Sequence, residues 1–238
     1  TVLIEDVAFP LKELPEATAD LQELLVTNEY HDACIYGHAL EGNFHFIISQ
    51  SFDSPEQVAR YEKLMDEVKT LVVDKYDGSL KAEHGTGRNM APFVKYEWGE
   101  KAYGFMKAVK ELFDPKGLLN PGVIFNEDPH CHLKHFKPMP LTNAHVDKCI
   151  ECGFCEVNCL TCGFSLSSRQ RIVIQREISR LKKLSDTESS ERLKTLQKQY
   201  KYLGNATCAG DGLCSMSCPM GINVGDLTHD IRQANLPE

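Results

Sequence analysis

Short strand-like runs alternate with helically spaced apolar residues over the first third of the chain. Val2 to Phe9 is rich in apolar and β-branched side chains and stops at Pro10, which predicts a strand. From Pro15 to Thr27 the leucines recur three and four positions apart, which predicts a helix that opens on its proline. Further strands and a second long helix follow. This order predicts helices layered over an antiparallel sheet.

The further strands are predicted between Cys34 and Gln50, around a turn at Glu41-Gly42. If that turn has two residues, His38 lies directly opposite His45, with Cβ atoms about 4.5–5.5 Å apart. Ser54-Pro55 then opens a long helix with a serine cap and a proline in the first turn. Its expected buried stripe is Val58, Tyr61, Met65, Val68 and Val72.

Proline and glycine divide the rest of the chain. A helix is predicted from about Glu97 to Phe113, and the run from Asp114 to Gly122 stops it in an ordered, turn-rich tail. His130 to Leu141 shows no periodicity and is predicted to be a linker. We therefore expect a first domain over residues 1–129, this linker, and a second domain over residues 142–238.

The second domain is predicted to consist of a cysteine motif, two helices and another cysteine motif. Ser167 is the expected cap of the first helix, and Ser189-Ser190 precede the second. Residues 165–204 carry ten basic and four acidic side chains, a charge of +6. This segment is either a solvated helical face or a docking surface for an anionic partner or a membrane.

The bulk composition limits the functional classes. The chain has 238 residues and a net charge of −8, which gives no reason to expect nucleic-acid binding. No apolar run approaches the ~20 residues of a membrane-spanning helix, and no signal peptide is present. We expect a cytoplasmic protein with, at most, a peripheral contact at the inner face of a membrane. Because the chain begins at Thr1 without Met, we expect its true start upstream.

Eight of the ten cysteines fall between Cys149 and Cys218. Cys149 opens a C-x2-C-x2-C-x3-C run that ends at Cys159. In such a run three thiolates hold one tetranuclear iron–sulfur cluster and the fourth binds a neighbouring cluster. Disulfide scaffolds are small and secreted, and zinc sites use separated C-x2-C pairs, so the spacing favours iron–sulfur over both alternatives.

The second motif ends as C-x3-C-P but has Asp211 where a cysteine would stand. Crossed ligation predicts a first 4Fe-4S cluster on Cys149, Cys152, Cys155 and Cys218. It leaves three thiols for a second cluster, namely Cys159, Cys208 and Cys214. Cys162 is the preferred fourth ligand, Asp211 is the other candidate, and a trinuclear 3Fe-4S cluster with three ligands is the third option.

The two hairpin histidines are the other candidate site. Two imidazoles at that separation can share a divalent cation with one carboxylate, and Glu83, on a glycine-rich loop, is the preferred one. His84 would then be placed as a proton acceptor. The alternative is that His38 and His45 are half-buried packing residues.

Three stretches together resemble the C-terminal part of FAD-linked oxidases, the group of D-lactate dehydrogenase, glycolate oxidase and D-2-hydroxyglutarate dehydrogenase. They are His38 to His45, Glu83 to Arg88 and Phe113 to Gly122. The cysteine module resembles the long D-lactate dehydrogenases that carry their own iron–sulfur domain. The resemblance covers nearly the whole chain.

The resemblance implies an α+β cap domain followed by an all-α ferredoxin-like domain. It implies that FAD is bound mainly by an N-terminal domain outside this piece, so the piece alone is expected to be inactive. His38, His45 and Glu83 would bind a divalent metal such as Zn or Mn that orients a D-2-hydroxy acid, and His84 would be the general base. Electrons would pass from FAD through the clusters to a quinone or cytochrome.

Two positions depart from the family pattern. Leu160 replaces the proline that usually follows the fourth cysteine, which leaves the ligands of the second cluster open. Ile47 stands where some relatives have a polar substrate contact, which argues against assuming a dicarboxylic substrate. The expected substrate is D-lactate. The rival hypothesis is a non-catalytic iron–sulfur electron-transfer module, but such a relay needs neither a base nor a substrate metal.

Overall fold

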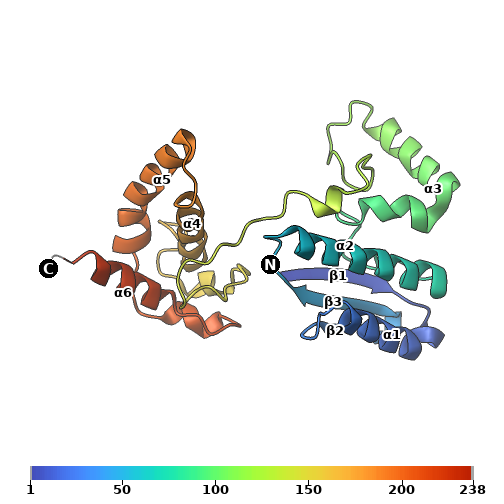
Figure 1. The fold of residues 1–238 in the computed structure, drawn as a ribbon, viewed down its shortest axis with the longest axis horizontal. Helices are drawn as coiled ribbons and strands as arrows, with labels where there is room; N and C mark the ends of the chain where they lie inside the picture. Colours follow the sequence, from blue (N-terminus) through green and yellow to red (C-terminus); the bar gives the residue numbers. More distant parts are fainter. Residues whose placement is uncertain (1, 237–238) are drawn as a thin grey trace. The chain divides into compact units, whose positions relative to one another are not determined.

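The computed structural model describes residues 2–236, which form two compact units with their boundary between Pro138 and Met139 (Figure 1). The first unit contains the only strands among these residues, and the second is built from helices and short turns. The predicted combination of helices with a small antiparallel sheet is confirmed. The ferredoxin-like arrangement of the second unit stays a prediction.

The sheet has the strand order β1-β3-β2, with both neighbouring pairs antiparallel. Its strands are β1 (Val2–Ala8), β2 (Cys34–His38) and β3 (Asn43–Ser49). Helix α1 (Leu14–Thr27) lies between β1 and β2 in the chain, and α2 (Pro55–Lys69) follows β3. A π-helical turn, Thr70–Lys75, continues α2.

The helices cover one face of the sheet because side chains alternate along each strand. Val7 of β1 and Phe46 of β3 join Tyr61 of α2 in the buried core. The neighbouring positions Asp6 and His45 point the other way and are paired across the two strands. The face away from α1 and α2 therefore carries the polar residues of the candidate site.

Helix α2 begins at the predicted place. The Ser54 hydroxyl accepts a hydrogen bond from the Gln57 backbone N–H, and the Gln57 side chain accepts one from the Ser54 backbone N–H. This reciprocal pair satisfies two donors that a helix end leaves free. Four residues of the predicted stripe, Tyr61, Met65, Val68 and Val72, are buried together with Leu64, whereas Val58 is half-buried.

The predicted register of the hairpin is wrong by two residues. His38 pairs with Asn43, and His45 pairs with Tyr36, because the strands are joined by four residues rather than two. Gly42 closes the connection in the left-handed conformation at φ 69°, and its carbonyl accepts a hydrogen bond from the Phe9 backbone N–H. A Cβ at this glycine would lie 2.2 Å from the Phe9 carbonyl oxygen, so the position requires glycine.

Helix α3 (Ala91–Phe113) begins six residues before the predicted start at Glu97. Pro92 lies in its first turn, where the missing N–H is tolerated. Gly99 then adopts φ 72° and ψ 168°, so α3 consists of two helical segments that meet at an angle (Figure 1).

The turn after α3 is ordered around Asp114. The Lys110 ammonium and the backbone N–H groups of Leu119 and Leu118 lower the pKa of Asp114 to about 2.

The segment predicted as a linker begins as part of the first unit. His132 is buried beside the Phe93 ring, and the Phe136 ring stacks on Phe52 with centroids 3.9 Å apart. These aromatic contacts fix residues 130–136 against the first core.

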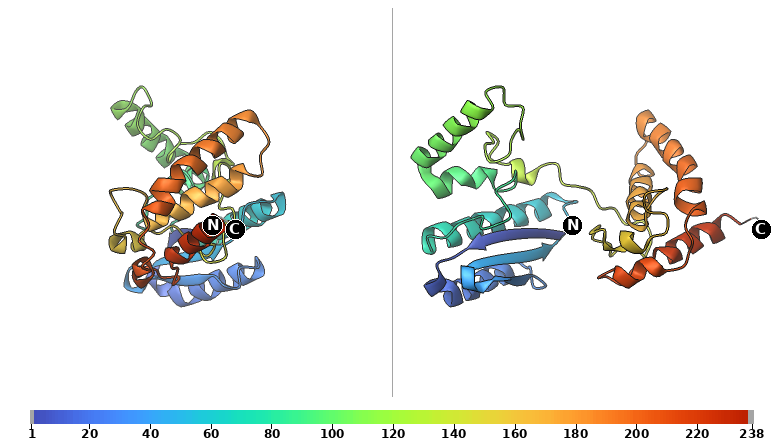
Figure 2. Two further views of the ribbon diagram at one scale, coloured as in Figure 1. Left: turned by 90° about the vertical axis from the view of Figure 1, so that its left-hand side faces the viewer. Right: turned by 180° about the vertical axis from the view of Figure 1, so that it is seen from behind.

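Helices α4 (Ser168–Leu181) and α5 (Thr187–Tyr200) lie between the cysteine motifs, side by side and joined by a short turn (Figure 2). Ser167 caps α4 as predicted. Helix α5 begins before the predicted serines, because the Asp186 carboxylate accepts a hydrogen bond from the Ser189 backbone N–H.

The sequence patterns did not indicate α6 (Val224–Ala234), whose amphipathic run is short. None of the helices described is long and apolar enough to cross a bilayer.

Candidate functional site

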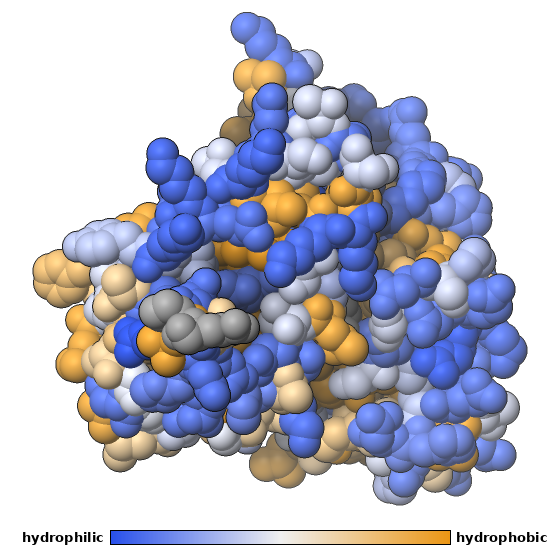
Figure 3. Space-filling model, turned by 60° about the vertical axis from the view of Figure 1, so that its left-hand side comes forward, coloured by the Kyte–Doolittle hydropathy of each residue, from blue (hydrophilic) through white to orange (hydrophobic). Residues whose placement is uncertain are grey.

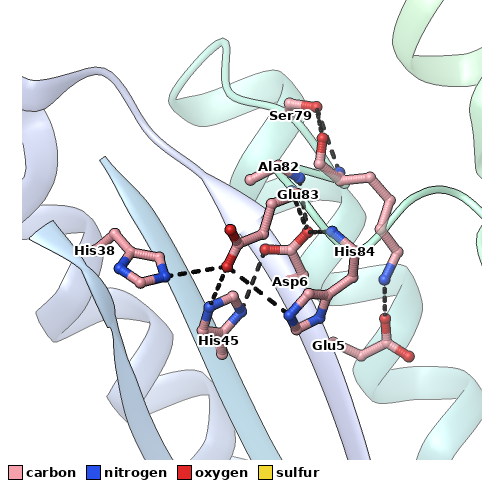
Figure 4. Close-up of polar contacts among 9 residues, drawn as sticks. Glu5, Asp6, His38, His45, Ser79, Ala82, Glu83 and His84 are labelled. Carbon is pink, nitrogen blue, oxygen red and sulfur yellow. Dashed lines mark hydrogen bonds and ion pairs between the residues drawn. The ribbon is translucent and has the colours of Figure 1, made fainter. Parts of the chain in front are cut away.

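The four residues predicted for the hairpin site lie together on the open face of the sheet (Figure 4). The Oε1 atom of Glu83 lies 3.1 Å from His38 Nε2, 3.0 Å from His45 Nε2 and 3.9 Å from His84 Nε2. One carboxylate oxygen therefore faces three imidazole nitrogens. The two-residue error in register preserved this grouping, because it leaves each side chain on the same face.

The site has a buried floor and an open rim. The His45 side chain is 5% exposed, whereas those of His38 and His84 are 60% and 43% exposed. The His84 ring stacks on the His45 ring with centroids 4.4 Å apart and planes 4° apart. This stacking fixes the orientation of an accessible imidazole above a buried one.

Asp6 is a functional residue that the sequence analysis missed. Its Oδ2 accepts hydrogen bonds from the backbone N–H groups of Ala82, Glu83 and His84, at 2.9, 2.8 and 2.9 Å. Its Oδ1 lies 3.3 Å from Nδ1 of His45. The carboxylate thus holds both the loop that presents Glu83 and the ring of the buried histidine. The available signal was an acidic side chain within an apolar strand.

The charge of Asp6 sets the tautomer of His45. Burial alone would raise the pKa of Asp6, but hydrogen bonds from the backbone N–H groups of His84, Glu83 and Ala82 hold it below the ordinary value. An ionised carboxylate opposite Nδ1 favours the proton on that nitrogen. With a cation between Nε2 and Glu83, the lone pair of Nε2 would be the ligand, as in histidines that ligate metals.

These residues fit a divalent cation. One ligand atom each from Asp6, His45, Glu83 and His84 lies within 4.8 Å of the others. His38 stands at the edge of this group and contacts it through Glu83. Two buried atoms, Asp6 Oδ1 and His45 Nδ1, make no ideal hydrogen bond in the part of the chain described and face each other. That arrangement suits an outer carboxylate that orients a metal-binding imidazole.

The adjacent residue Glu5 anchors the same loop from the other face of the sheet. Its carboxylate accepts from Lys81 Nζ at 2.8 Å and from the Asn89 side chain. Burial raises the pKa of Glu5, and the Lys81 ammonium opposes that rise. Loop residues 79–84 are therefore tied to β1 through two consecutive carboxylates (Figure 4).

The second unit has two thiol-lined cavities, and all ten cysteines of the chain are free. The first cavity is lined by the four thiols predicted for the first cluster. They are Cys149, Cys152, Cys155 and Cys218. The backbone N–H of Glu151 donates to the Sγ atom of Cys149 at 3.3 Å. Donors of this type stabilise the negative charge of thiolates and sulfides.

The second cavity brings together Cys159, Cys208 and Cys214. Asp211 also lines it. The preferred fourth ligand, Cys162, is not among the lining residues and is exposed to solvent. The structure therefore brings together three of the four thiols predicted for the second cluster.

The two motifs form matching turns. Gly153 and Gly212 are both left-handed, at φ 88° and 73°, and each precedes a 3-10 turn of five residues that leads into a cysteine. The turns are Phe154–Asn158 and Leu213–Ser217. Asp211 stands immediately before its glycine, in the place that Cys152 holds in the first motif. Asp211 therefore corresponds in position to Cys152, and its Oδ1 accepts a hydrogen bond from the Leu213 backbone N–H at 3.1 Å.

The thiols differ in their electrostatic surroundings. Burial raises the pKa of Cys149, Cys155 and Cys214. Burial would also raise the pKa of Cys159, but hydrogen bonds from Thr161, Ser168 and Arg171 lower it below the ordinary value. Among these four thiols, the half-buried Cys159 of the second cavity is the one whose pKa lies below its ordinary value.

The basic helices surround a groove of about 570 Å³. Hydrophilic side chains cross hydrophobic patches on the face shown in Figure 3. Ile178 and Ile231 line the groove, together with the basic residues Lys182, Lys194, Lys198 and Lys201. Nothing in the described residues identifies an occupant, so the docking of an anionic partner or a membrane here stays a prediction.

Comparisons with known proteins match the two units to two different family models. Residues 1–124 match the family model of FAD linked oxidases, C-terminal domain. Residues 145–222 match the model of the 4Fe-4S dicluster domain.

Three curated relatives resemble about half of the chain. They are "Glycolate oxidase subunit GlcD" of Bacillus subtilis (27% identity over 54% of this chain), "D-2-hydroxyglutarate dehydrogenase" of Stutzerimonas stutzeri (33% over 50%) and "D-lactate dehydrogenase [cytochrome] 1, mitochondrial" of Saccharomyces cerevisiae (30% over 52%). The matched region spans 27%, 26% and 21% of their respective lengths. The first family model covers just over half of the chain. The chain therefore belongs to the FAD-linked oxidase family through that family's C-terminal domain, to which it joins a 4Fe-4S dicluster domain.

Proposed function

We propose that this chain is part of an FAD- and iron–sulfur-dependent D-2-hydroxy-acid dehydrogenase that oxidises D-lactate. Electrons pass from FAD through the clusters to a quinone or cytochrome. The observation that carries this proposal is the convergence of His38, His45 and His84 on Glu83. A pure electron relay has no use for such a group.

Each residue of the hairpin site has a role that follows from its position. His45 and Glu83 hold the divalent cation with His38, and Asp6 keeps the His45 ring in the ligating tautomer. His84 is exposed enough to reach a substrate hydroxyl, and its Nε2 accepts the hydroxyl proton. A cation held by His38, His45 and Glu83 would supply Lewis acidity toward the substrate hydroxyl and positive charge for its carboxylate, and FAD would supply the hydride acceptor.

The test is anaerobic reduction of the flavin by D-lactate. In the holoenzyme, His84→Ala is expected to slow flavin reduction by about 10²- to 10⁴-fold, because that is the usual contribution of a general base. The visible spectra of the clusters should not change. His130→Ala is the matched control, since His130 is an exposed histidine on the same unit that pairs with Glu62. Unchanged flavin reduction in His84→Ala would refute the proposed role.

The two thiol cavities support two clusters with crossed ligation. The first set is Cys149, Cys152, Cys155 and Cys218. For the second set we propose Cys159, Cys208 and Cys214 with Asp211 as the fourth ligand, in preference to Cys162. The proposal rests on the cavity lining and on the match between Asp211 and Cys152. A carboxylate oxygen replaces a thiolate at one iron.

Single substitutions separate the candidates for the fourth ligand. Asp211→Ala is expected to convert the second cluster to a trinuclear form, giving the isotropic EPR signal of an oxidised 3Fe centre and the loss of one iron per chain. Cys162→Ser is expected to leave the iron content and the EPR spectrum unchanged. The reverse pattern would assign the ligand to Cys162, and a trinuclear signal already present in the unaltered protein would exclude both.

A further inference from the structure

Arg171 is the largest side chain that the fold buries completely, with 1% of its surface exposed. Its Nε donates to the Gly204 carbonyl oxygen at 2.6 Å. Its Nη2 donates to the hydroxyl oxygens of Thr161 and Thr207 at 2.9 and 3.1 Å. Its Nη1 lies 3.6 Å from the Sγ atom of Cys159, a hydrogen-bond distance for sulfur. Every nitrogen of the guanidinium is engaged inside the second unit.

None of the groups that accept a hydrogen bond from Arg171 is a carboxylate. Within residues 2–236 no ion pair reaches this guanidinium, although it carries a full charge. Arg176 on the same helix is buried to a similar degree, but its Nη1 lies 2.9 Å from Glu151 Oε1. Burying an unpaired charge costs several kcal/mol, about as much as a small domain's whole margin of stability, so such charges are almost always compensated.

The negative charge that compensates Arg171 is expected in the second cavity. Arg171 lines that cavity together with Cys159, Cys208 and Cys214. An iron–sulfur cluster on three thiolates and a carboxylate carries net negative charge, and accepting one electron makes it more negative by one unit. A fixed cation in a buried setting stabilises the reduced form more than the oxidised form.

We propose that Arg171 is the built-in counter-charge of the second cluster and raises its reduction potential. This inference rests on the proposed function, since it requires a cluster in that cavity. The step it affects is transfer of one electron to the cluster, with no bond made or broken. Arg171 is a tuning and positioning residue and does not touch the hydroxy acid.

The test is an EPR-monitored redox titration of the anaerobically purified protein. Arg171→Gln is expected to shift the potential of the second cluster to more negative values and to leave the first cluster unchanged. Arg171→Lys keeps the charge and is expected to retain most of the potential. Arg169→Gln is the matched control, because it removes the same charge from α4, but Arg169 lines the first cavity and pairs with Glu156 at 3.2 Å. Its second-cluster potential should match that of the unaltered protein.

A second pair of variants covers the case in which Arg171→Gln fails to fold. Thr207→Asp places a carboxylate beside the guanidinium and neutralises it in place, and Thr207→Asn is the uncharged control. Thr207→Asp is expected to lower the potential of the second cluster, and Thr207→Asn is not. Equal potentials in the two Thr207 variants, or in Arg171→Gln and Arg171→Lys, would overturn the inference.

Iron and sulfide analysis distinguishes this failure from failure of the proposed function. Iron for a single cluster in the unaltered protein would remove the second cluster and the inference with it. If iron for two clusters is found but the reduction potential of the second cluster does not change with the charge at position 171, only the role of Arg171 is overturned.

Discussion

Asp6→Asn is expected to weaken divalent-cation binding at the hairpin site by about 10- to 100-fold, the usual effect of losing an outer partner of a ligating histidine. The asparagine is nearly isosteric, and its carbonyl oxygen can still accept the three backbone N–H groups of residues 82–84. Its NH₂ group then faces Nδ1 of His45 as a donor. The imidazole must accept there and carry its proton on Nε2, the nitrogen that faces Glu83.

Isothermal titration with Zn²⁺ and with Mn²⁺ measures this effect on metal-free protein. Glu41→Gln removes the same charge from an exposed position in the hairpin connection and should bind as tightly as the unaltered protein. Thermal unfolding of the first unit serves as a second control, because the hydrogen bonds to the loop persist. Equal affinities for Asp6→Asn and Glu41→Gln would show that the tautomer of His45 does not govern the site.

Removal of iron is expected to unfold the second unit and leave the first unit folded. The buried hydrophobic cluster around the thiols comprises Val146, Ile172, Cys214, Ile222, Val224 and Leu227, and the other buried apolar residues described in the second unit are Ile178, Leu181 and Tyr200. Cys214 is itself a proposed cluster ligand, and three further thiols pack against this core. So few apolar side chains cannot offset the conformational entropy of about one hundred residues, so cluster binding supplies much of the folding free energy.

Hydrogen exchange under anaerobic conditions, before and after chelation of iron, measures this prediction. Amides of α4 and α6 should lose their protection after chelation, whereas those of α2 and β3 should keep it. The first unit provides the internal reference, because its core contains seventeen buried residues and no cysteine. Persistent protection of α4 and α6 in the iron-free protein would show that the helices are stable without the clusters.

Local patterns were sufficient for most of the first unit. The cap at Ser54 and the proline beside it placed the start of α2, since both act within one helical turn. The hairpin histidines were assigned to one face despite a wrong register, because an even shift leaves side-chain direction unchanged. The shift itself depends on contacts between Gly42 and Phe9, residues that are distant in the chain.

Non-local contacts also account for the missed residues. Asp6 lies in β1 and receives its partners from residues 82–84, so no short window contains the arrangement. Arg171 is the same residue type as its neighbours Arg169 and Arg180, whose side chains are partly exposed, and the sequence alone does not show which arginines are buried. The break at Gly99 was also missed, because a single glycine within a helical pattern is usually tolerated.

Strand β1 places Glu5 and Asp6 on opposite faces, and both tie down the loop that carries Glu83. A one-residue deletion or insertion upstream within this strand that shifts its register would exchange the two carboxylates. The acid that orients His45 would then enter the apolar layer, and the partner of Lys81 would face the imidazoles. In directed evolution or loop grafting, the length of this strand can therefore change only in steps of two.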